Sequence, residues 1–335
     1  MRPGYQLRRA RDIAGSLRLA RRGTAAERLP RERLRALQRN RLRSLVRHAG
    51  THAPWHRERL AAALRGGDEG ELTCLPRMNK KSLMAHFDDA VCDRRLTISA
   101  LDTHTAGLRR DELLFGEYRV ATTGGTSGVK AYFCFSRSAW RANMAYFPRC
   151  AAALGFGPRM PRYRIAQITA GGPLHLTHRL ATTVDLGVYR TLRLDVLASL
   201  ETLAKELQDF QPDCLTGYPT ILALLADEQV AGRLGIRPRA CAVTAEQCTG
   251  EMRRRIERAW GIQPFDAYAT TETGGPLAFE CSAHQGMHIF EDRVIVEVLD
   301  ADGRPAVDGS PGRSVLLTTL DNFVQPIITR REIFR

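Results

Sequence analysis

The sequence predicts an α/β protein built on a parallel, doubly wound sheet with flanking helices. Short apolar segments alternate with helix-length segments through the middle of the chain, which is typical of strand–helix–strand units. Glycine and proline residues separate these segments, as expected for turns between elements. The chain has 335 residues, of which 44% are apolar, so it can bury a sizeable core.

The N-terminal region, residues 1–117, is predicted to be helical and rich in arginine. Between residues 31 and 63, leucine and valine recur at helical spacing among arginines. Pro54 breaks this pattern. Asn79 follows a Leu-Pro loop and is predicted to cap the next helix.

Residues 118–275 form the predicted α/β core. Strands are expected at 118–122, 132–135, 164–169, 214–216, 240–244 and 264–267. Helices are expected at 140–153 after Ser136 or Ser138 as N-cap, and at 194–210, 220–229 and 249–260. The third region, residues 276–335, is predicted to be rich in β-structure. Its expected strands are 293–299, 314–319 and 325–328, with a hairpin-type turn at Asp302-Gly303.

The formal net charge is +14, carried mainly by arginine and densest before about residue 60. Such a charge suits nucleic acid, an anionic membrane surface or acidic ligands. No nucleic-acid motif accompanies it, which favours a solvated helical face without a specific nucleic-acid partner. There is no apolar run of transmembrane length and no secretory pattern at the N-terminus. The eight cysteines are scattered, so a cytoplasmic protein with reduced thiols is expected.

The segment T-G-G-T-S-G-V-K, Thr123 to Lys130, is the first candidate site. Its glycines allow a backbone to approach an anion closely; they are Gly124, Gly125 and Gly128. Its hydroxyl donors are Thr123, Thr126 and Ser127. Lys130 adds a positive charge, so the loop can cradle phosphate. The spacing is not that of a Walker A loop, and a structural turn is the alternative.

The segment Y-A-T-T-E, Tyr268 to Glu272, follows a predicted strand. Open α/β sheets bind ligands at the carboxyl ends of their strands. A tyrosine can stack on a base, threonines such as Thr270 and Thr271 can donate to phosphate, and Glu272 can bind Mg²⁺. A helix cap is the alternative interpretation of a Thr-Glu pair.

Together the two segments resemble the paired signatures of the adenylate-forming superfamily. Within it, the chain resembles the branch that contains phenylacetate–CoA ligases and capsule-biosynthesis-type ligases. The supporting segments are L-P-R-M-N-K-K-S-L, G-Y-P-T, T-A-E, E-M-R-R-R-I-E-R-A-W-G and H-I-F-E-D-R-V-I-V-E-V. Their order and spacing match, and the resemblance covers approximately residues 30–328.

The resemblance implies the large N-terminal domain of an adenylate-forming enzyme, with doubly wound mixed sheets, flanking helices and a β-rich C-terminal subdomain. It implies that ATP and a small carboxylic acid give an acyl-adenylate, from which CoA displaces AMP. By position, residues 123–130 would hold the β- and γ-phosphates, with Lys130, Thr271 and Glu272 in catalysis. Tyr268 and Thr270 would bind the nucleotide, Thr271 would contact the α-phosphate, and Glu272 would ligate Mg²⁺.

Further roles follow from the same resemblance. Ala245 and Glu246 would lie beside the adenine. The candidates for the acyl pocket are His175, His178, Tyr218, Phe279 and His288. For the two histidines of P-L-H-L-T-H, a surface position is at least as well supported.

The C-terminal segment departs from the family pattern. Thr329-Arg330 stands where the family has Arg-Tyr, the ribose-binding Asp is missing, and no mobile C-terminal domain with its catalytic Lys precedes Arg335. A truncated or frameshifted reading frame and a degenerate stand-alone homologue would each explain this. Weak or no ligase activity is therefore expected of the chain alone, unless a separate C-terminal domain or carrier protein assists. A non-catalytic protein that binds nucleotide or a partner, alone or as a homodimer, is the competing hypothesis.

Cys281, His284 and His288 stand at spacings of three and four residues. Such a set can bind Zn²⁺, with Cys241 or Cys248 as a remote fourth ligand. A loop beside the acyl pocket is the alternative, since no second pair of ligands accompanies the three.

Overall fold

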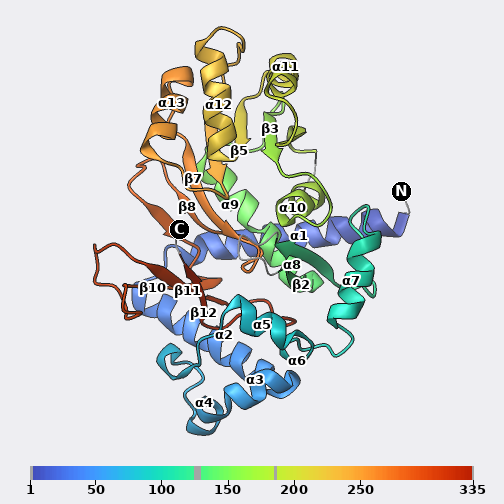
Figure 1. The fold of residues 1–335 in the computed structure, drawn as a ribbon, viewed down its shortest axis with the longest axis vertical. Coiled ribbons are helices and arrows are strands. Elements are labelled where there is room, and N and C mark those ends of the chain that lie inside the picture. The colour runs from blue at the N-terminus through green and yellow to red at the C-terminus, as the bar shows by residue number, and fades with distance from the viewer. Residues whose placement is uncertain (1–2, 124–129, 185–186, 334–335) are drawn as a thin grey trace. The chain divides into compact units, whose positions relative to one another are not determined.

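The computed structural model describes residues 3–123, 130–184 and 187–333, in two compact units (Figure 1). The first unit comprises Met1–Ala145, Thr271–Gly274 and Ile289–Arg335; the second comprises Tyr146–Thr270 and Gly275–His288. Both units are discontinuous in the chain, so they differ from the three consecutive regions expected from the sequence. No helix within the described residues is long and apolar enough to cross a membrane.

Helices form the N-terminal part of the first unit, as predicted. They are α1 (Pro3–Ala26), α2 (Arg31–His52), α3 (Pro54–Arg59), α4 (Ala61–Gly66), α5 (Lys80–Ala85), α6 (Phe87–Ala90) and α7 (Ile98–Gly107), with a 3₁₀ turn at Leu72–Cys74. Pro54 occupies the first turn of α3, where its missing N–H costs nothing. Asn79 caps α5 in a reciprocal capping box with Ser82. Both predicted boundaries are confirmed.

The glycine-loop hairpin consists of β1 (Arg119–Thr123) and β2 (Ala131–Phe135), which pair antiparallel. Ser136 then caps α8 (Arg137–Met144) through a bond from Ala139 N. The Gln325 side chain accepts from Cys134 N and donates to Tyr132 O, and Asn322 donates to Cys134 O. These side-chain amides make the hydrogen bonds to backbone groups of β2 that a third strand of the sheet would otherwise make. Residues 325–328 are therefore not the strand that we expected.

A three-stranded antiparallel sheet completes the first unit, in the order β10-β11-β12. Its strands are β10 (Val294–Leu299), β11 (Ser314–Thr319) and β12 (Arg330–Ile333). The Asp302-Gly303 turn lies in the connection from β10 to β11, with Gly303 at φ +77°. Leu320 and Ile328 pack with Leu42, Leu45 and neighbouring apolar residues of the N-terminal helices.

The second unit is built on a seven-stranded sheet in the order β4-β3-β5-β6-β7-β8-β9. The strands are β3 (Arg164–Thr169), β4 (Arg190–Asp195), β5 (Cys214–Gly217), β6 (Ala240–Thr244), β7 (Phe265–Thr270), β8 (Gly275–Glu280) and β9 (Met287–Ile289). The helices are α9 (Tyr146–Ala153), α10 (Leu176–Val184), α11 (Leu200–Phe210), α12 (Pro219–Val230) and α13 (Gly250–Trp260). Strands β4, β3, β5, β6 and β7 are parallel, whereas β8 pairs antiparallel with β7. The sheet is therefore mixed, with a parallel centre.

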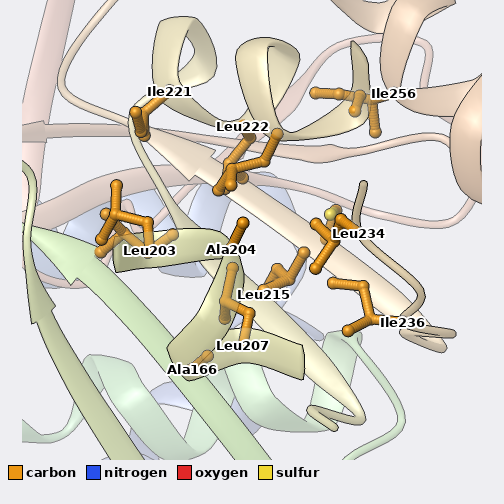
Figure 2. Packing of buried hydrophobic residues seen from close by; sticks show 14 of the residues in the cluster. Ala166, Leu203, Ala204, Leu207, Leu215, Ile221, Leu222, Leu234, Ile236 and Ile256 are labelled. Carbon is orange, nitrogen blue, oxygen red and sulfur yellow. The ribbon is translucent and has the colours of Figure 1, made fainter. Parts of the chain in front are cut away.

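One apolar core joins one face of this sheet to α11, α12 and α13 (Figure 2). Alternate residues of the central strands, such as Ala166, Leu215 and Val243, meet leucines of the helices there. Successive side chains of a strand point to opposite faces of the sheet, so only every second residue faces these helices. The opposite face of β5 and β6 presents small and polar residues such as Thr216, Ala242 and Thr244.

One predicted helix began too early. Residues 190–195 form the edge strand β4, and α11 begins only at Leu200, after Ser199 caps it through Thr202 N. Arginines at positions 190 and 193 obscured the strand pattern, because an edge strand tolerates charged side chains on its exposed positions.

Candidate functional site

The carboxyl edge of the second unit's sheet contains a topological switch point. Strand β3 lies between β4 and β5, so the chain leaves β3 toward one side and later continues from β5 toward the other. Ligands of open α/β sheets bind at such a point, outside the carboxyl ends of the strands. Segments of the predicted site follow these strands, including Tyr218 after β5 and Ala245-Glu246 after β6.

Side-chain hydrogen bonds connect the ends of neighbouring strands at this edge. Ala170 N donates to the Tyr218 hydroxyl at 3.4 Å, which bridges the two sides of the switch point. Thr220 Oγ1 donates to Glu246 Oε2 at 2.6 Å. Thr244 Oγ1 donates to Ala267 O at 2.9 Å, which ties β6 to β7. The structure thus brings Tyr218, Ala245 and Glu246 to one edge.

Ala245 is held in a left-handed conformation with φ +71°. An alanine there is strained, because its Cβ crowds the following carbonyl oxygen. Such strain is concentrated at functional sites. The left-handed conformation of Ala245 is therefore one that alanine disfavours, so the surrounding structure has to maintain it.

Tyr268 lies inside β7 and not after it, since β7 extends to Thr270. A register shift between Tyr268 and Ala269 marks an irregularity where β7 pairs with β8. Bulges of this kind redirect side chains and are frequent near active sites. Tyr268 and Thr270 belong to the second unit, whereas Thr271 and Glu272 belong to the first.

Thr271 to Gly274 form a tight turn whose amide Gly274 N donates to Thr271 O at 3.1 Å. Gly274 adopts φ +75°, and a Cβ on it would lie 2.1 Å from Asn143 Nδ2. Glycine is thus required here both by conformation and by the close approach of α8. Glu272 is only 7% exposed, so packing fixes the carboxylate on this turn.

Arg293, at the start of β10, organises the residues beside that turn. Its Nη2 donates to Asn143 Oδ1 at 3.2 Å, its Nη1 donates to Ala142 O, and its Nε pairs with Asp321. The Arg293 side chain is only 5% exposed. A planar guanidinium with three fixed acceptors orients Asn143, against which Gly274 packs.

The glycine loop itself, residues 124–129, lies outside the described residues, so the roles of Gly124, Gly125, Thr126, Ser127 and Gly128 stay predictions. The two flanking residues are described. Lys130 Nζ lies 3.4 Å from Asp102 Oδ1 and 4.6 Å from the centre of the Tyr132 ring. Hydrogen bonds from Tyr132 and then Lys130 lower the pKa of Asp102. Thr123 Oγ1 is buried without a hydrogen-bond partner among the described residues.

The acyl-pocket candidates are dispersed. His175 is exposed at the start of α10, and His288 is exposed on the edge strand β9, which β6, β7 and β8 separate from β5. Phe279 is buried and stacks on Phe265 with ring centres 6.1 Å apart. Burial lowers the pKa of His178, and neighbouring cations including Arg193 lower it further. These roles stay predictions.

The predicted zinc set is not formed. Within the described part of the chain, no three His, Cys, Asp or Glu side chains gather to hold a metal ion. His284 Nδ1 instead lies 3.2 Å from Glu280 Oε2, and the same carboxylate accepts from Arg253 Nη2 at 2.9 Å. His288 lies on β9, beyond the turn that contains His284. The spacing of these residues in the sequence does not show whether their side chains point toward one another.

Comparison with known proteins agrees with this geometry. Phenylacetate-coenzyme A ligase of Thermus thermophilus is 27% identical over 323 residues, covering 90% of this chain and 65% of the relative. The Escherichia coli protein of the same name is 27% identical, with coverage of 90% and 66%. The Pseudomonas putida protein is 29% identical, with coverage of 89% and 65%. The chain is thus similar in sequence to phenylacetate–coenzyme A ligases over about nine tenths of its length.

The chain spans just under two thirds of the length of those relatives. Its fold is that of a solved 2-hydroxyisobutyryl-CoA ligase in complex with an acyl-AMP and CoA. The TM-score is 0.70 at 21% identity, over 91% of this chain and 64% of the other. No protein-family model matches the chain.

Sequence reasoning missed Asn143, Arg293 and Asp102 as residues beside the site. Arg293 falls within the H-I-F-E-D-R segment that supports the resemblance, but its contact with Asn143 joins residues 150 positions apart in the chain. Only the folded structure shows that it supports the turn at Gly274.

Proposed function

We propose that this protein activates a small carboxylic acid with ATP and transfers the acyl group to CoA. A carboxylate oxygen attacks the α-phosphorus, the bond to the β-phosphate breaks, and pyrophosphate leaves. The CoA thiolate then attacks the acyl carbon, and AMP leaves with the bonding electron pair. No protein nucleophile is needed, because positioning and charge stabilisation promote both steps.

The homology to phenylacetate–coenzyme A ligases over 90% of the chain supports this proposal. A second support is the position of Ala245-Glu246 and Tyr218 at the switch point of the sheet, where nucleotides bind in such folds. We assign Tyr268 and Ala245-Glu246 to adenine, with Thr270 as a further nucleotide contact. The strained backbone at Ala245 favours close approach of a flat base.

The first unit supplies the proposed phosphate contacts. We assign Thr123, the loop 124–129 and Lys130 to the β- and γ-phosphates, and Thr271 to the α-phosphate. In the structure Lys130 Nζ lies 3.4 Å from Asp102 Oδ1, and hydrogen bonds with Tyr132 and then Asp102 raise the pKa of its ammonium group. Lys130 then has to exchange that carboxylate for phosphate, so Asp102 sets the strength of the phosphate contact.

Glu272 is the residue that we assign to Mg²⁺. Magnesium is usually bound by one or two carboxylates together with substrate phosphates and water, so a single glutamate fits this role. The buried turn holds that carboxylate in place. When bound, the cation would neutralise charge on the phosphates. Zinc is not part of the proposal.

We infer an aromatic or short branched acid as the substrate, with Tyr218 at the acyl site and His175, Phe279 and His288 as further candidates. A cytoplasmic location accompanies the proposal, because all eight cysteines are free thiols in the structure. We propose CoA as the acceptor of the acyl group. A carrier protein is the alternative acceptor, and identifying the thioester product distinguishes the two.

The test is ATP–pyrophosphate exchange by the purified chain with phenylacetate and a panel of small carboxylic acids. Under this proposal exchange depends on the acid and on Mg²⁺ and falls at least about 100-fold in Glu272→Gln. Appreciable exchange by the unchanged chain would overturn the expectation that the chain alone is weak or inactive. Arg258→Gln, an exposed change on α13, is the matched control and should leave exchange unchanged. Nucleotide binding without exchange under any acid would instead favour a non-catalytic homologue. The expectation of weak turnover by the chain alone stays a prediction until this is measured.

A further inference from the structure

The amino edge of the second unit's sheet gathers five arginines. Strands β3 and β4 begin at Arg164 and Arg190, which are register partners, and Arg239 directly precedes β6. These strands are parallel, so their first residues lie along one edge. Arg159 and Arg162 precede β3 in the chain. We call these five residues the amino-edge arginines.

Four of these arginine side chains lie over two aromatic rings. The Arg164 and Arg190 guanidinium carbons lie 4.9 and 5.8 Å from the centre of the Phe210 ring. Those of Arg159 and Arg239 lie 3.7 and 5.6 Å from the centre of the Tyr163 ring. Stacking on a ring restrains an arginine and leaves its N–H groups at the edge able to donate.

Asp213, just before β5, is the only carboxylate that pairs with any of the five in the described ranges, through Arg159 at 3.4 Å. Its other contacts are to backbone: Oδ2 accepts from Arg164 N, and its carbonyl accepts from Arg239 N. Among the described residues, one ion pair with a carboxylate thus accompanies five guanidinium groups at this edge. Arg162 donates to the carbonyl of Gly187, which adds no negative charge.

Three other arginines of the same unit each pair with acidic side chains. Arg233 pairs with Glu228, Arg255 with Asp227, and Arg253 with both Glu280 and Asp266. Of the amino-edge arginines, only Arg159 has such a pair among the described residues. In addition, Arg164 Nε is buried and has no hydrogen-bond partner among the described residues. Like charges gathered along one edge repel one another, and a bound anion relieves that repulsion.

We propose that the amino-edge arginines form a binding site for phosphate groups, separate from the proposed nucleotide site. Guanidinium groups match phosphate oxygens in pairs and remain charged at any physiological pH. Several of them along one edge favour a ligand with more than one phosphate. Two sources share this chemistry, a small polyphosphorylated molecule and the backbone of a nucleic acid.

The site is distinct from the proposed catalytic machinery because the strands are parallel. Tyr218 and Ala245-Glu246 follow the carboxyl ends of β5 and β6, whereas the arginines stand at or before the amino ends. A phosphate ligand at the amino edge therefore leaves the carboxyl edge accessible. The inference does not depend on whether the chain forms adenylates.

The experiment compares Arg190→Gln/Arg239→Gln with the matched control Arg258→Gln and with the unchanged chain. Positions 190, 239 and 258 are all exposed, so the substitutions should leave folding intact, which thermal unfolding without ligand verifies. Tripolyphosphate is titrated calorimetrically at low ionic strength, and a fluorescent single-stranded oligonucleotide is titrated in parallel. None of the substitutions lies at the carboxyl edge, so tripolyphosphate binding there would be the same in all three proteins and would not affect the comparison.

We expect the double variant to bind tripolyphosphate at least about tenfold more weakly than the control and the unchanged chain. The same loss with the oligonucleotide, together with a smaller salt dependence, identifies a nucleic-acid backbone as the source. Loss with tripolyphosphate alone identifies a small phosphorylated molecule. Equal affinity in the three proteins, or no binding by the unchanged chain, overturns the proposal.

Discussion

Replacing Gly274 by alanine should destabilise the first unit by about 2–4 kcal/mol, because two separate costs add. The first is the left-handed backbone at φ +75°, which costs an alanine about 1 kcal/mol. The second is overpacking, since the new Cβ would lie 2.1 Å from Asn143 Nδ2 and 2.4 Å from its Cγ. Relieving such a contact in a packed region costs about 1–3 kcal/mol.

Gly67→Ala separates the two costs. Gly67 also has φ +75°, but nothing lies within 4 Å of the position of its Cβ, so only the backbone cost of about 1 kcal/mol applies. Equilibrium urea unfolding of both variants measures the difference. In the Asn143→Ala background, the Gly274→Ala cost should approach that of Gly67→Ala, because the obstructing side chain is gone. Equal destabilisation by the two glycine variants would refute the role assigned to Asn143.

Three further changes test buried polar groups of the first unit, each by urea unfolding. Gln325→Leu should cost about 2–4 kcal/mol, because its fully buried amide satisfies two backbone groups of β2; a loss below about 1 kcal/mol would contradict this. Asp111→Ala should cost about 3–5 kcal/mol, since it leaves the buried Arg119 guanidinium without its carboxylate; a neutral effect would be inconsistent with burial of that pair. Burial, and then the charge of Arg59, lower the pKa of His56 from 6.5 to about 4. The folded state therefore resists protonation, so stability is complete above pH 6.5 and falls by about 2 kcal/mol between pH 7 and pH 5. His56→Gln should remove that part of the pH dependence, and an unchanged dependence would show that the histidine is not responsible.

Elements with strong local signals were predictable from the sequence. The predicted bounds of β3 and β6 match the structure, because each is a short apolar run between turn residues. Asn79 was predicted as a cap and Ser136 as one of two candidates with Ser138, since such side chains satisfy helix amides locally; the structure shows that Asn79 and Ser136 are the caps. The edge strand β4 was missed because Arg190 and Arg193 interrupt the alternation of Leu192 and Leu194, and the whole segment has only two apolar residues.

Features that depend on contacts between distant segments were not predictable. Residues 325–328 look like a strand in sequence, yet the Gln325 side chain takes the hydrogen bonds that a neighbouring strand would make with β2. The zinc prediction failed because spacing says nothing about direction, and His284 pairs with Glu280 instead. The paired motifs predict site residues whose roles stay predictions, and they give no sign of the support that Arg293 and Asn143 give to the turn at Gly274.

The central claim, that the turn at Glu272 binds Mg²⁺ together with a nucleotide, is tested most directly by calorimetric titration of ATP. The unchanged chain should bind ATP at least about tenfold more tightly with Mg²⁺ than with EDTA. In Glu272→Gln this Mg²⁺ dependence should disappear, while the weaker metal-free binding persists, because the adenine contacts are intact. No ATP binding by the unchanged chain, or the same Mg²⁺ dependence in both proteins, would contradict the account.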